Sequence, residues 1–155
     1  MELALYDRRI RELAADADRI GRLAEPDTSA TAHSRLCGSR VTADICLRNG
    51  IITAHGHQVR ACLVGQASAA LLAKLIVGPP VPAMSAGKAA MQALLTDRRI
   101  PQTDPWRVLE LFLPIADFPS RHGAALLPFE AVEQALAQLG DRANPTAVSL
   151  TRLLS

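Results

Sequence analysis

We predict an α+β fold, in which a three-stranded antiparallel meander carries helices packed mainly on one of its faces. The first observation is the alternation of apolar and polar residues over positions 40–47, which is typical of a strand with one buried face. The second is Asn49-Gly50, because this pair tolerates the positive φ angles of a type I′ hairpin turn and so predicts that residues 51–59 fold back antiparallel. The third is the alanine-rich segment 63–77, whose small side chains let a helix lie close to the sheet before Gly78-Pro79-Pro80 ends it.

Two elements are expected before the hairpin. Residues 2–22 carry apolar side chains at helical spacing with charged residues between them, and Pro26 prevents continuation, so we predict an N-terminal helix there. We expect this helix to pack across the core, with docking of a partner as the alternative. A turn-rich connector follows it, and residues 31–36 are then expected to form a short edge strand that leads to Cys37-Gly38.

The second half of the chain is predicted to be mostly helical. A helix is expected over 85–96 with Ser85 as its N-cap, and a loop over 101–105 separates it from a short helix over 106–113. After a connector over 114–119, the spacing of apolar residues predicts a final amphipathic helix over 126–139. The pattern of the tail after Gly140 leaves open whether that tail docks on the fold.

Length and composition narrow the class of protein. The 155 residues predict a single domain, with an N-terminal helix within 1–23, a core over 30–139 and a tail over 140–155. Only 3% of the residues are aromatic, so platforms that stack nucleic-acid bases are not expected. The net charge is only +2, and the basic residues are interleaved with acidic ones, so we expect no binding to nucleic acid.

The sequence also predicts a cytoplasmic protein that does not bind membranes. The first 20 residues carry charges throughout and lack the uninterrupted apolar region of a signal peptide. The most apolar segment, 63–77, is shorter than a membrane span and is interrupted by Gln66, Ser68 and Lys74. Three cysteines in such a chain favour reduced thiols, which are buried, metal-bound or reactive, over a disulfide framework.

Two of the three cysteines stand where predicted elements begin. Cys62 opens the alanine-rich helix, where free backbone amides and the helix dipole stabilise a thiolate, and Arg60 lies close in sequence. Cys37 precedes Gly38, a residue that lets the backbone bend tightly around a ligand. Cys46 falls on the polar side of its strand and is interpreted as an ordinary strand cysteine. For each of these thiols, the alternative to a site is a small, buried, inert side chain.

The histidines and short motifs do not define a functional site on their own. His33, His55, His57 and His122 are candidate metal ligands or acid–base groups, although a single histidine is more often a surface or hydrogen-bonded core residue. His122 is the most interesting, because it precedes the last helix in a connector that could reach the thiols. The sequence has no CxxC, HExxH, P-loop or GxGxxG pattern. Spacing alone therefore predicts only a thiol site at the ends of a small sheet.

Cys37-Gly38 and the segment 61–69 (ACLVGQASA), followed by Gly78, resemble the NifU N-terminal/IscU/SufU family of iron–sulfur cluster assembly scaffolds. That family pairs a Cys-Gly-Asp strand entry with a second cysteine that opens an Ala/Ser-rich helix, and the hairpin between the two fits as well. The resemblance extends to Pro119-Ser120-Arg121 and to residues 124–127, and it covers about residues 30–135. It implies a SufE/NifU-like fold and a scaffold or carrier rather than a catalyst.

Two positions depart from the family pattern. Ser39 stands where the family has its aspartate, and Ala124 stands where it has its third cysteine. The resemblance thus implies that Cys37 and Cys62 are thiolate ligands of iron or a nascent iron–sulfur cluster, with zinc as another metal that thiolates suit. His122 is the candidate third ligand if its loop shifts, and Cys46, a second protomer or an exogenous thiol are the alternatives.

The resemblance implies partners as well, and it leaves two other functions open. A cysteine desulfurase would deliver sulfur to such a scaffold, and acceptor proteins would receive the cluster. The first alternative is a sulfur-transfer protein resembling the SufE group, in which Cys62 alone carries a persulfide. The second is an interaction module that kept the fold and lost the metal site.

Overall fold

The structure, a computed structural model, describes residues 7–35 and 38–140. Its strands are β1 (Thr28–His33), β2 (Arg40–Arg48) and β3 (Ile51–Arg60). Its α-helices are α1 (Arg8–Asp16), α2 (Leu63–Leu75), α3 (Val81–Asp97) and α4 (His122–Leu139), and its 3-10 helices are η2 (Ala17–Arg19), η3 (Trp106–Asp117) and η4 (Pro119–Arg121). In this part of the chain, no helix is both long and apolar enough to cross a membrane.

The three strands form the predicted antiparallel meander, in the order β1-β2-β3. The hairpin turns at Asn49 and Gly50, whose φ angles of 53° and 75° are those that a type I′ turn requires. The outer edge of β3 is covered by two connectors, because the His57 amide donates to the Gly21 carbonyl at 2.8 Å and the Gly78 amide donates to the Ile52 carbonyl at 3.1 Å. This covering protects one edge of the sheet from pairing with other chains.

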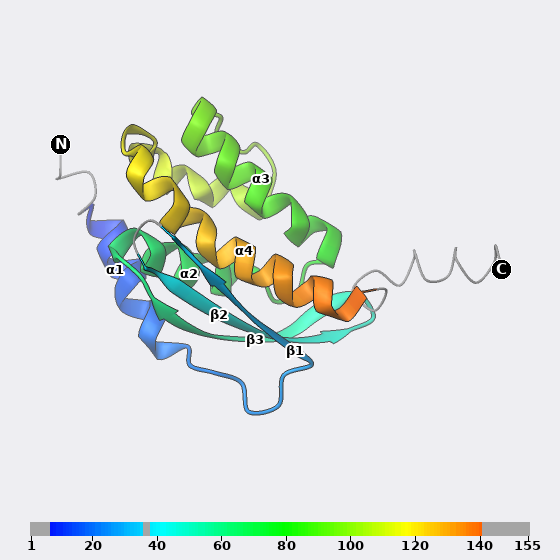
Figure 1. The fold of residues 1–155 in the computed structure, drawn as a ribbon. Helices are drawn as coiled ribbons and strands as arrows, with labels where there is room; N and C mark the ends of the chain where they lie inside the picture. Colours follow the sequence, from blue (N-terminus) through cyan, green and yellow to red (C-terminus); the bar gives the residue numbers. More distant parts are fainter. Residues whose placement is uncertain (1–6, 36–37, 141–155) are drawn as a thin grey trace.

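The helices lie on one face of the sheet, as predicted. Figure 1 shows α4 between the sheet and α3, and α4 contacts both β1 and β2. Helix α2 lies beside α4 and contacts β3, and α1 packs on α2. Small residues make this close packing feasible, because the α2–α4 layer contains alanines that are fully buried: Ala67, Ala70, Ala125, Ala131 and Ala135.

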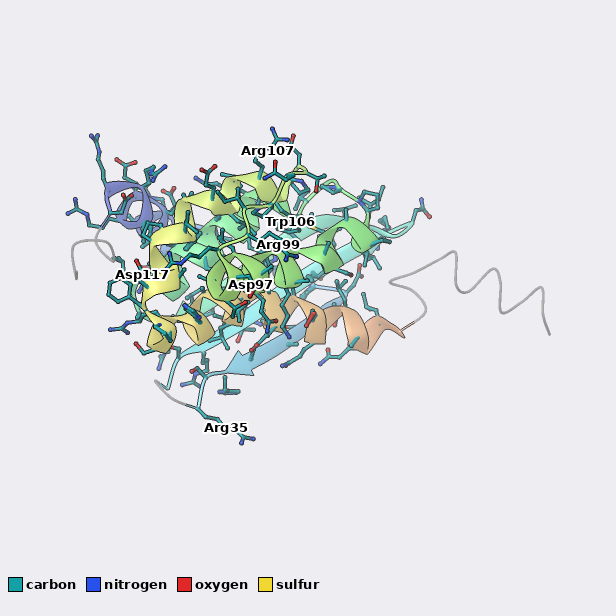
Figure 2. All side chains as sticks on the ribbon, turned by 90° about the horizontal axis from the view of Figure 1, so that it is seen from above. Arg35, Asp97, Arg99, Trp106, Arg107 and Asp117 are labelled. Carbon is teal, nitrogen blue, oxygen red and sulfur yellow. The ribbon has the colours of Figure 1, made fainter. Side chains whose placement is uncertain are left out.

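The predicted alternation in β2 places Val41, Ala43, Ile45 and Leu47 in the core under these helices. Cys46 lies on the other side of the strand and is half-buried, as predicted from the same alternation. Farther from the sheet, the Trp106 ring of η3 packs over Gly87 of α3, where an added Cβ would lie 2.5 Å from a ring carbon (Figure 2). The buried aromatic side chains of Trp106, Phe112 and Phe129 thus belong to the helical layers.

The opposite face of the sheet is partly covered by the connector between α1 and β1. Asp44 of β2 is fully buried there and accepts hydrogen bonds from the Arg22 side chain at 2.6 and 2.9 Å, from the Leu23 amide at 3.0 Å and from the Ser29 hydroxyl at 2.6 Å. Burial alone would raise the pKa of Asp44, but these hydrogen bonds outweigh it and hold the pKa below its ordinary value. The carboxylate therefore stays charged and fixes the connector to the sheet.

Several predicted bounds differ from the structure in the first half of the chain. The N-terminal helix begins after Asp7, whose carboxylate accepts from the Arg9 amide, and it ends at Asp16, short of the predicted residue 22. Residues 1–6 of that prediction lie outside the described part. The first strand spans Thr28–His33 rather than 31–36, because Thr28 to His33 are the residues that pair with β2.

The helical half also differs in its boundaries. Helix α3 begins at Val81 after Pro80, so Ser85 is not its N-cap; its hydroxyl instead donates to the Val81 carbonyl at 3.1 Å within the helix. The segment predicted as a connector over 114–119 continues η3 as far as Asp117. Helix α4 begins at His122, four residues before the predicted start, so His122 belongs to the helix and not to a connector. The division into one domain with a tail stays a prediction, because residues 141–155 lie outside the described part.

Candidate thiolate site

The register of the sheet brings three segments to one end of it. His33 at the end of β1 pairs with Arg40 at the start of β2, and Arg40 pairs with Arg60 at the end of β3. Ser39 directly precedes Arg40, and Cys62 lies two residues after Arg60. The segment that contains Cys37 and the segment that contains Cys62 therefore leave the sheet at the same end, as the sequence predicted.

Cys62 is the N-cap residue of α2, which confirms its predicted place at the start of this helix. Its side chain makes no capping hydrogen bond, is half-buried and packs partly against the core. The first turn of the helix is held by Gln66, whose amide donates to the Cys62 carbonyl at 3.0 Å and whose side chain donates to the Ala61 carbonyl at 2.9 Å. The thiol thus stands at the start of the helix, where the first backbone amides have no partner within the helix itself.

The start of α4 lies against the start of α2. A Cβ built on Gly65 would lie 2.6 Å from the Ala61 Cβ, 3.4 Å from the Ala124 carbonyl oxygen and 3.7 Å from the Ala124 Cβ. One turn farther along, the Ser68 hydroxyl donates to the Ala125 carbonyl at 2.6 Å. Position 124 is therefore next to the helix that Cys62 opens, and Ala124 itself is only 3% exposed. Sequence reasoning did not find this close contact, although the spacing of Ala61 and Gly65 by one helical turn was a signal for it.

His122 is the first residue of α4 and is half-buried. Its Nε2 lies 3.1 Å from the Ile115 carbonyl and 3.2 Å from the Ala116 carbonyl. Because both neighbours only accept hydrogen bonds, Nε2 carries the proton in this arrangement, and Nδ1 is the nitrogen left to bind a metal. The contacts hold the ring toward the end of η3.

The segment between β1 and β2 carries Cys37, which lies outside the described residues together with Leu36. On one side of it, Arg35 extends away from the body of the fold (Figure 2). On the other side, Gly38 has a φ of +69°, and its amide donates to the Ser34 carbonyl at 3.1 Å. The Ser34 amide donates in turn to the carbonyl of Ser39, which is buried. These two bonds close a tight loop, so the glycine after Cys37 serves the sharp bend that the sequence predicted.

Cationic side chains surround this end of the sheet on its open face. A hollow of about 350 Å³ is lined by Thr31, His33, Arg40, Thr42, Gln58 and Arg60. Arg40 and Arg60 are directly opposite each other, and among the described residues neither takes part in an ion pair. Like charges at such a cross-strand pair are unfavourable, so they suit an anionic group nearby.

The other candidate residues lie elsewhere. Cys46 is six residues along β2 from Arg40, roughly 20 Å at about 3.3 Å per residue, so the alternative that it joins the ligand set is wrong. Its Sγ lies 3.6 Å from the Glu25 carbonyl. His57 is buried with Nε2 at 2.7 Å from the Ala17 carbonyl, and its ring stands edge-on to that of His55. Within residues 7–35 and 38–140, no three His, Cys, Asp or Glu side chains are grouped so that they could hold a metal ion.

Comparison with known proteins decides the family. The chain matches no protein-family model and no curated protein. Among solved structures, it is similar to a nitrogen-fixing NifU-like protein (N-terminal) from Brucella abortus, with 37% identity and a TM-score of 0.83 over 90% of this chain and 97% of that one. The chain belongs to the NifU-like N-terminal family.

A second solved structure has a similar fold. It is described as a putative iron–sulfur cluster assembly scaffold protein for the SUF system from the thermophile Fervidobacterium islandicum AW-1. That structure is 17% identical with a TM-score of 0.78, and the match covers 84% of this chain and 96% of that one. Both comparisons confirm the predicted α+β fold, and the first confirms the family resemblance.

Proposed function

We propose that this NifU-like chain is an iron–sulfur cluster assembly scaffold that holds iron or a nascent cluster on the thiolates of Cys37 and Cys62. The proposal is supported by the arrangement of three segments in a chain of the NifU-like family: the start of α2, the start of α4 and the chain between β1 and β2. Cys62 stands at the start of α2, position 124 adjoins the first turn of that helix, and the segment of Cys37 leaves the sheet beside them. Thiolates are the ligands that iron–sulfur clusters and zinc prefer.

The remaining ligands must be groups other than the aspartate and the third cysteine of the family pattern. Ser39 supplies no carboxylate, and Ala124 supplies no thiol where position 124 meets α2. Nδ1 of His122 is the third donor that the chain offers, and it requires a shift of the helix start that carries it. If His122 does not bind, a second copy of the chain or a small thiol would supply the third ligand. The unpaired Arg40 and Arg60 would favour the negative charge of a thiolate-bound cluster.

The proposed partners follow from the chemistry of assembly. Sulfur would reach the site from a cysteine desulfurase, and the finished cluster would pass to acceptor proteins. Both exchanges need an accessible site, and Cys62 is half-buried at a sheet end rather than enclosed in the core. We place this work in the cytoplasm and assign the chain a carrier role without a catalysed reaction of its own.

Anaerobic reconstitution with iron and sulfide tests the scaffold proposal. The wild-type chain should develop the visible absorbance of an iron–sulfur cluster, and Cys37→Ser combined with Cys62→Ser should abolish it. Cys46→Ser is the matched control, because it removes a thiol at the far end of β2 and should leave the spectrum unchanged. A featureless wild-type spectrum, or equal absorbance in the double variant, would reject cluster binding.

A persulfide carrier is the second candidate, and the replacement of the third thiol by Ala124 favours it. In that reaction, the Cys62 thiolate attacks the outer sulfur of a desulfurase persulfide, a new S–S bond forms on Cys62, and the desulfurase cysteine leaves as a thiolate. No net oxidation is needed. Mass spectrometry after incubation with a desulfurase should find one added sulfur on Cys62, and sulfur that is absent or found on Cys46 would exclude this function.

A further inference from the structure

At the end of the molecule away from the thiols, helices α2, α3 and α4 enclose an apolar groove of about 490 Å³. Its walls include Leu72 and Ile76 of α2, Val81 and Met84 of α3, and Val132 and Leu136 of α4. These side chains expose at most 7% of their surface, so the groove is narrow and suits inserted side chains rather than a whole helix. Lys88 and Glu133 pair across its rim at 3.2 Å.

The C-terminal end of α4 borders this groove. Gly140, which follows the last residue of α4, lines it together with Ala137. Gly140 has φ 56° and ψ −124°, which are the angles of the first central residue of a type II′ turn. A chain that leaves a helix through a type II′ turn reverses its direction, so the angles of Gly140 are compatible with a tail that folds back toward the groove.

The remaining 15 residues, 141–155, have a sequence that suits binding in this groove. Asn144-Pro145 is a helix-start pair, with an N-cap asparagine before a proline at the first helical position. Leu150, Leu153 and Leu154 recur at the spacing of one helical face, whereas Val148 and Arg152 fall on the opposite face. Ten residues of helix would measure about 15 Å, and four residues of connector reach up to about 13 Å, so the span from Gly140 suffices.

We propose that segment 145–154 of this chain binds the groove between α2, α3 and α4 by inserting its leucine face. Leu150 and Leu154 enter between Met84 of α3 and Leu136 of α4, and Arg152 on the opposite face stays in water. The apolar surface of the tail leucines is then removed from water, together with the small part that the groove side chains still expose. This contact is separate from the thiolate site and stands whether or not that site holds a cluster.

Methyl NMR of the full chain tests the proposal, because Met84 lies in the groove and Met91 lies two turns away in the same helix, fully buried outside it. With the methionine methyl groups labelled, Leu150→Asp should shift the Met84 resonance and leave the Met91 resonance in place. Val148→Asp is the matched control for an added charge on the other face, and it should leave both resonances where they are in the wild type.

Three NMR results would overturn the proposal. The Met84 resonance could be the same in the wild type and in Leu150→Asp, or the two aspartate variants could shift it equally. A Met84 shift that changes with protein concentration would instead assign the groove to a second copy of the chain. As a second readout, Leu150→Asp should lower the midpoint of thermal unfolding more than Val148→Asp does, and equal midpoints would contradict the docking.

Discussion

Asp44 holds the connector between α1 and β1 onto the open face of the sheet. It is fully buried, and each of its two carboxylate oxygens accepts a hydrogen bond from the guanidinium of Arg22. The Leu23 amide and the Ser29 hydroxyl satisfy its remaining lone pairs. A buried carboxylate with complete partners stabilises the fold, whereas the same group with a partner removed is costly.

We therefore expect Asp44→Asn to destabilise the fold by about 1–3 kcal/mol, because the buried amide nitrogen cannot accept the hydrogen bonds that one carboxylate oxygen now accepts. The free energy of unfolding in urea measures this effect. Glu12→Gln is the matched control, since the Arg8–Glu12 pair is exposed and its loss should cost less than about 0.5 kcal/mol. Equal losses in the two variants would mean that the Asp44 contacts add nothing beyond a surface pair.

Ala124 marks the place where this chain departs from a three-thiolate site. Its Cβ lies 3.7 Å from the position of a Cβ on Gly65, in the turn that follows Cys62. We predict that Ala124→Cys increases the iron retained per chain after anaerobic reconstitution. Ala125→Cys is the control, because Ala125 belongs to the hydrophobic core cluster and its thiol would be buried there. The prediction is wrong if both variants retain the same iron as the wild type.

At the residue scale, the sequence analysis predicted that Cys62 stands at the start of a helix, but it did not predict which residues lie next to that thiol. The place of Cys62 at a helix start followed from the turn pattern before it. The spacing of apolar residues predicted a last helix from residue 126, which left His122 in a connector. In the structure α4 begins at His122 and continues through Pro128, and the Ser68 hydroxyl donates to the Ala125 carbonyl in that extra segment.

At the scale of elements, the contact between the starts of α2 and α4 shapes the candidate site. Gly65 lies in this contact, where an added Cβ would clash with the Ala61 Cβ at 2.6 Å and would meet the Ala124 carbonyl at an ordinary 3.4 Å. Gly65→Ala should destabilise the fold by about 1–3 kcal/mol through overpacking, as measured by urea unfolding.

Gly123→Ala supplies the control for that substitution. A Cβ on Gly123 meets nothing within 4 Å, and the residue lies in the first turn of α4. Alanine there should be neutral or stabilise the fold by up to about 1 kcal/mol, because it restricts the unfolded chain. If Gly65→Ala were as harmless as Gly123→Ala, the start of α2 would not be packed as tightly against Ala61 as the structure has it.

The elements that the sequence predicted well are those with local signals. The meander follows from the alternation in β2 and from Asn49-Gly50, which need no knowledge of the rest of the fold. Helix α3 was predicted to start too late, because Ser85 is a good N-cap by type although the chain turns at Pro80. The bound of β1 depends on pairing with β2, and such pairing is a tertiary contact that composition does not reveal.

For the molecule as a whole, the half-buried His55 and the buried His57 make the fold sensitive to acid. Burial, and then the neighbouring His57, lower the pKa of His55 to about 4, and its Nδ1 has no hydrogen-bond partner in the described part of the chain. Burial also lowers the pKa of His57. Because the unfolded chain binds these protons more readily, the stability that neutral His55 contributes is present above about pH 6.5 and is lost as the pH falls toward about 4.

We predict that His55 accounts for about 2 kcal/mol of stability lost between about pH 7 and pH 5. His55→Gln should remove that part of the pH dependence, as measured by urea unfolding at several pH values. His33→Gln should leave the dependence unchanged, since His33 is exposed at the end of β1. An unaltered slope in His55→Gln would show that another group binds the protons.

The most direct test of the central claim is the metal and sulfide content of the full chain purified without oxygen. A scaffold should carry iron with sulfide, or zinc held by the same thiolates, at a constant ratio to the protein. That content should fall to background when Cys37 and Cys62 are both replaced by serine, and it should persist in Cys46→Ser. Wild-type chains with no metal above background, or metal that is indifferent to the double replacement, would contradict the claim that these two cysteines form a scaffold site.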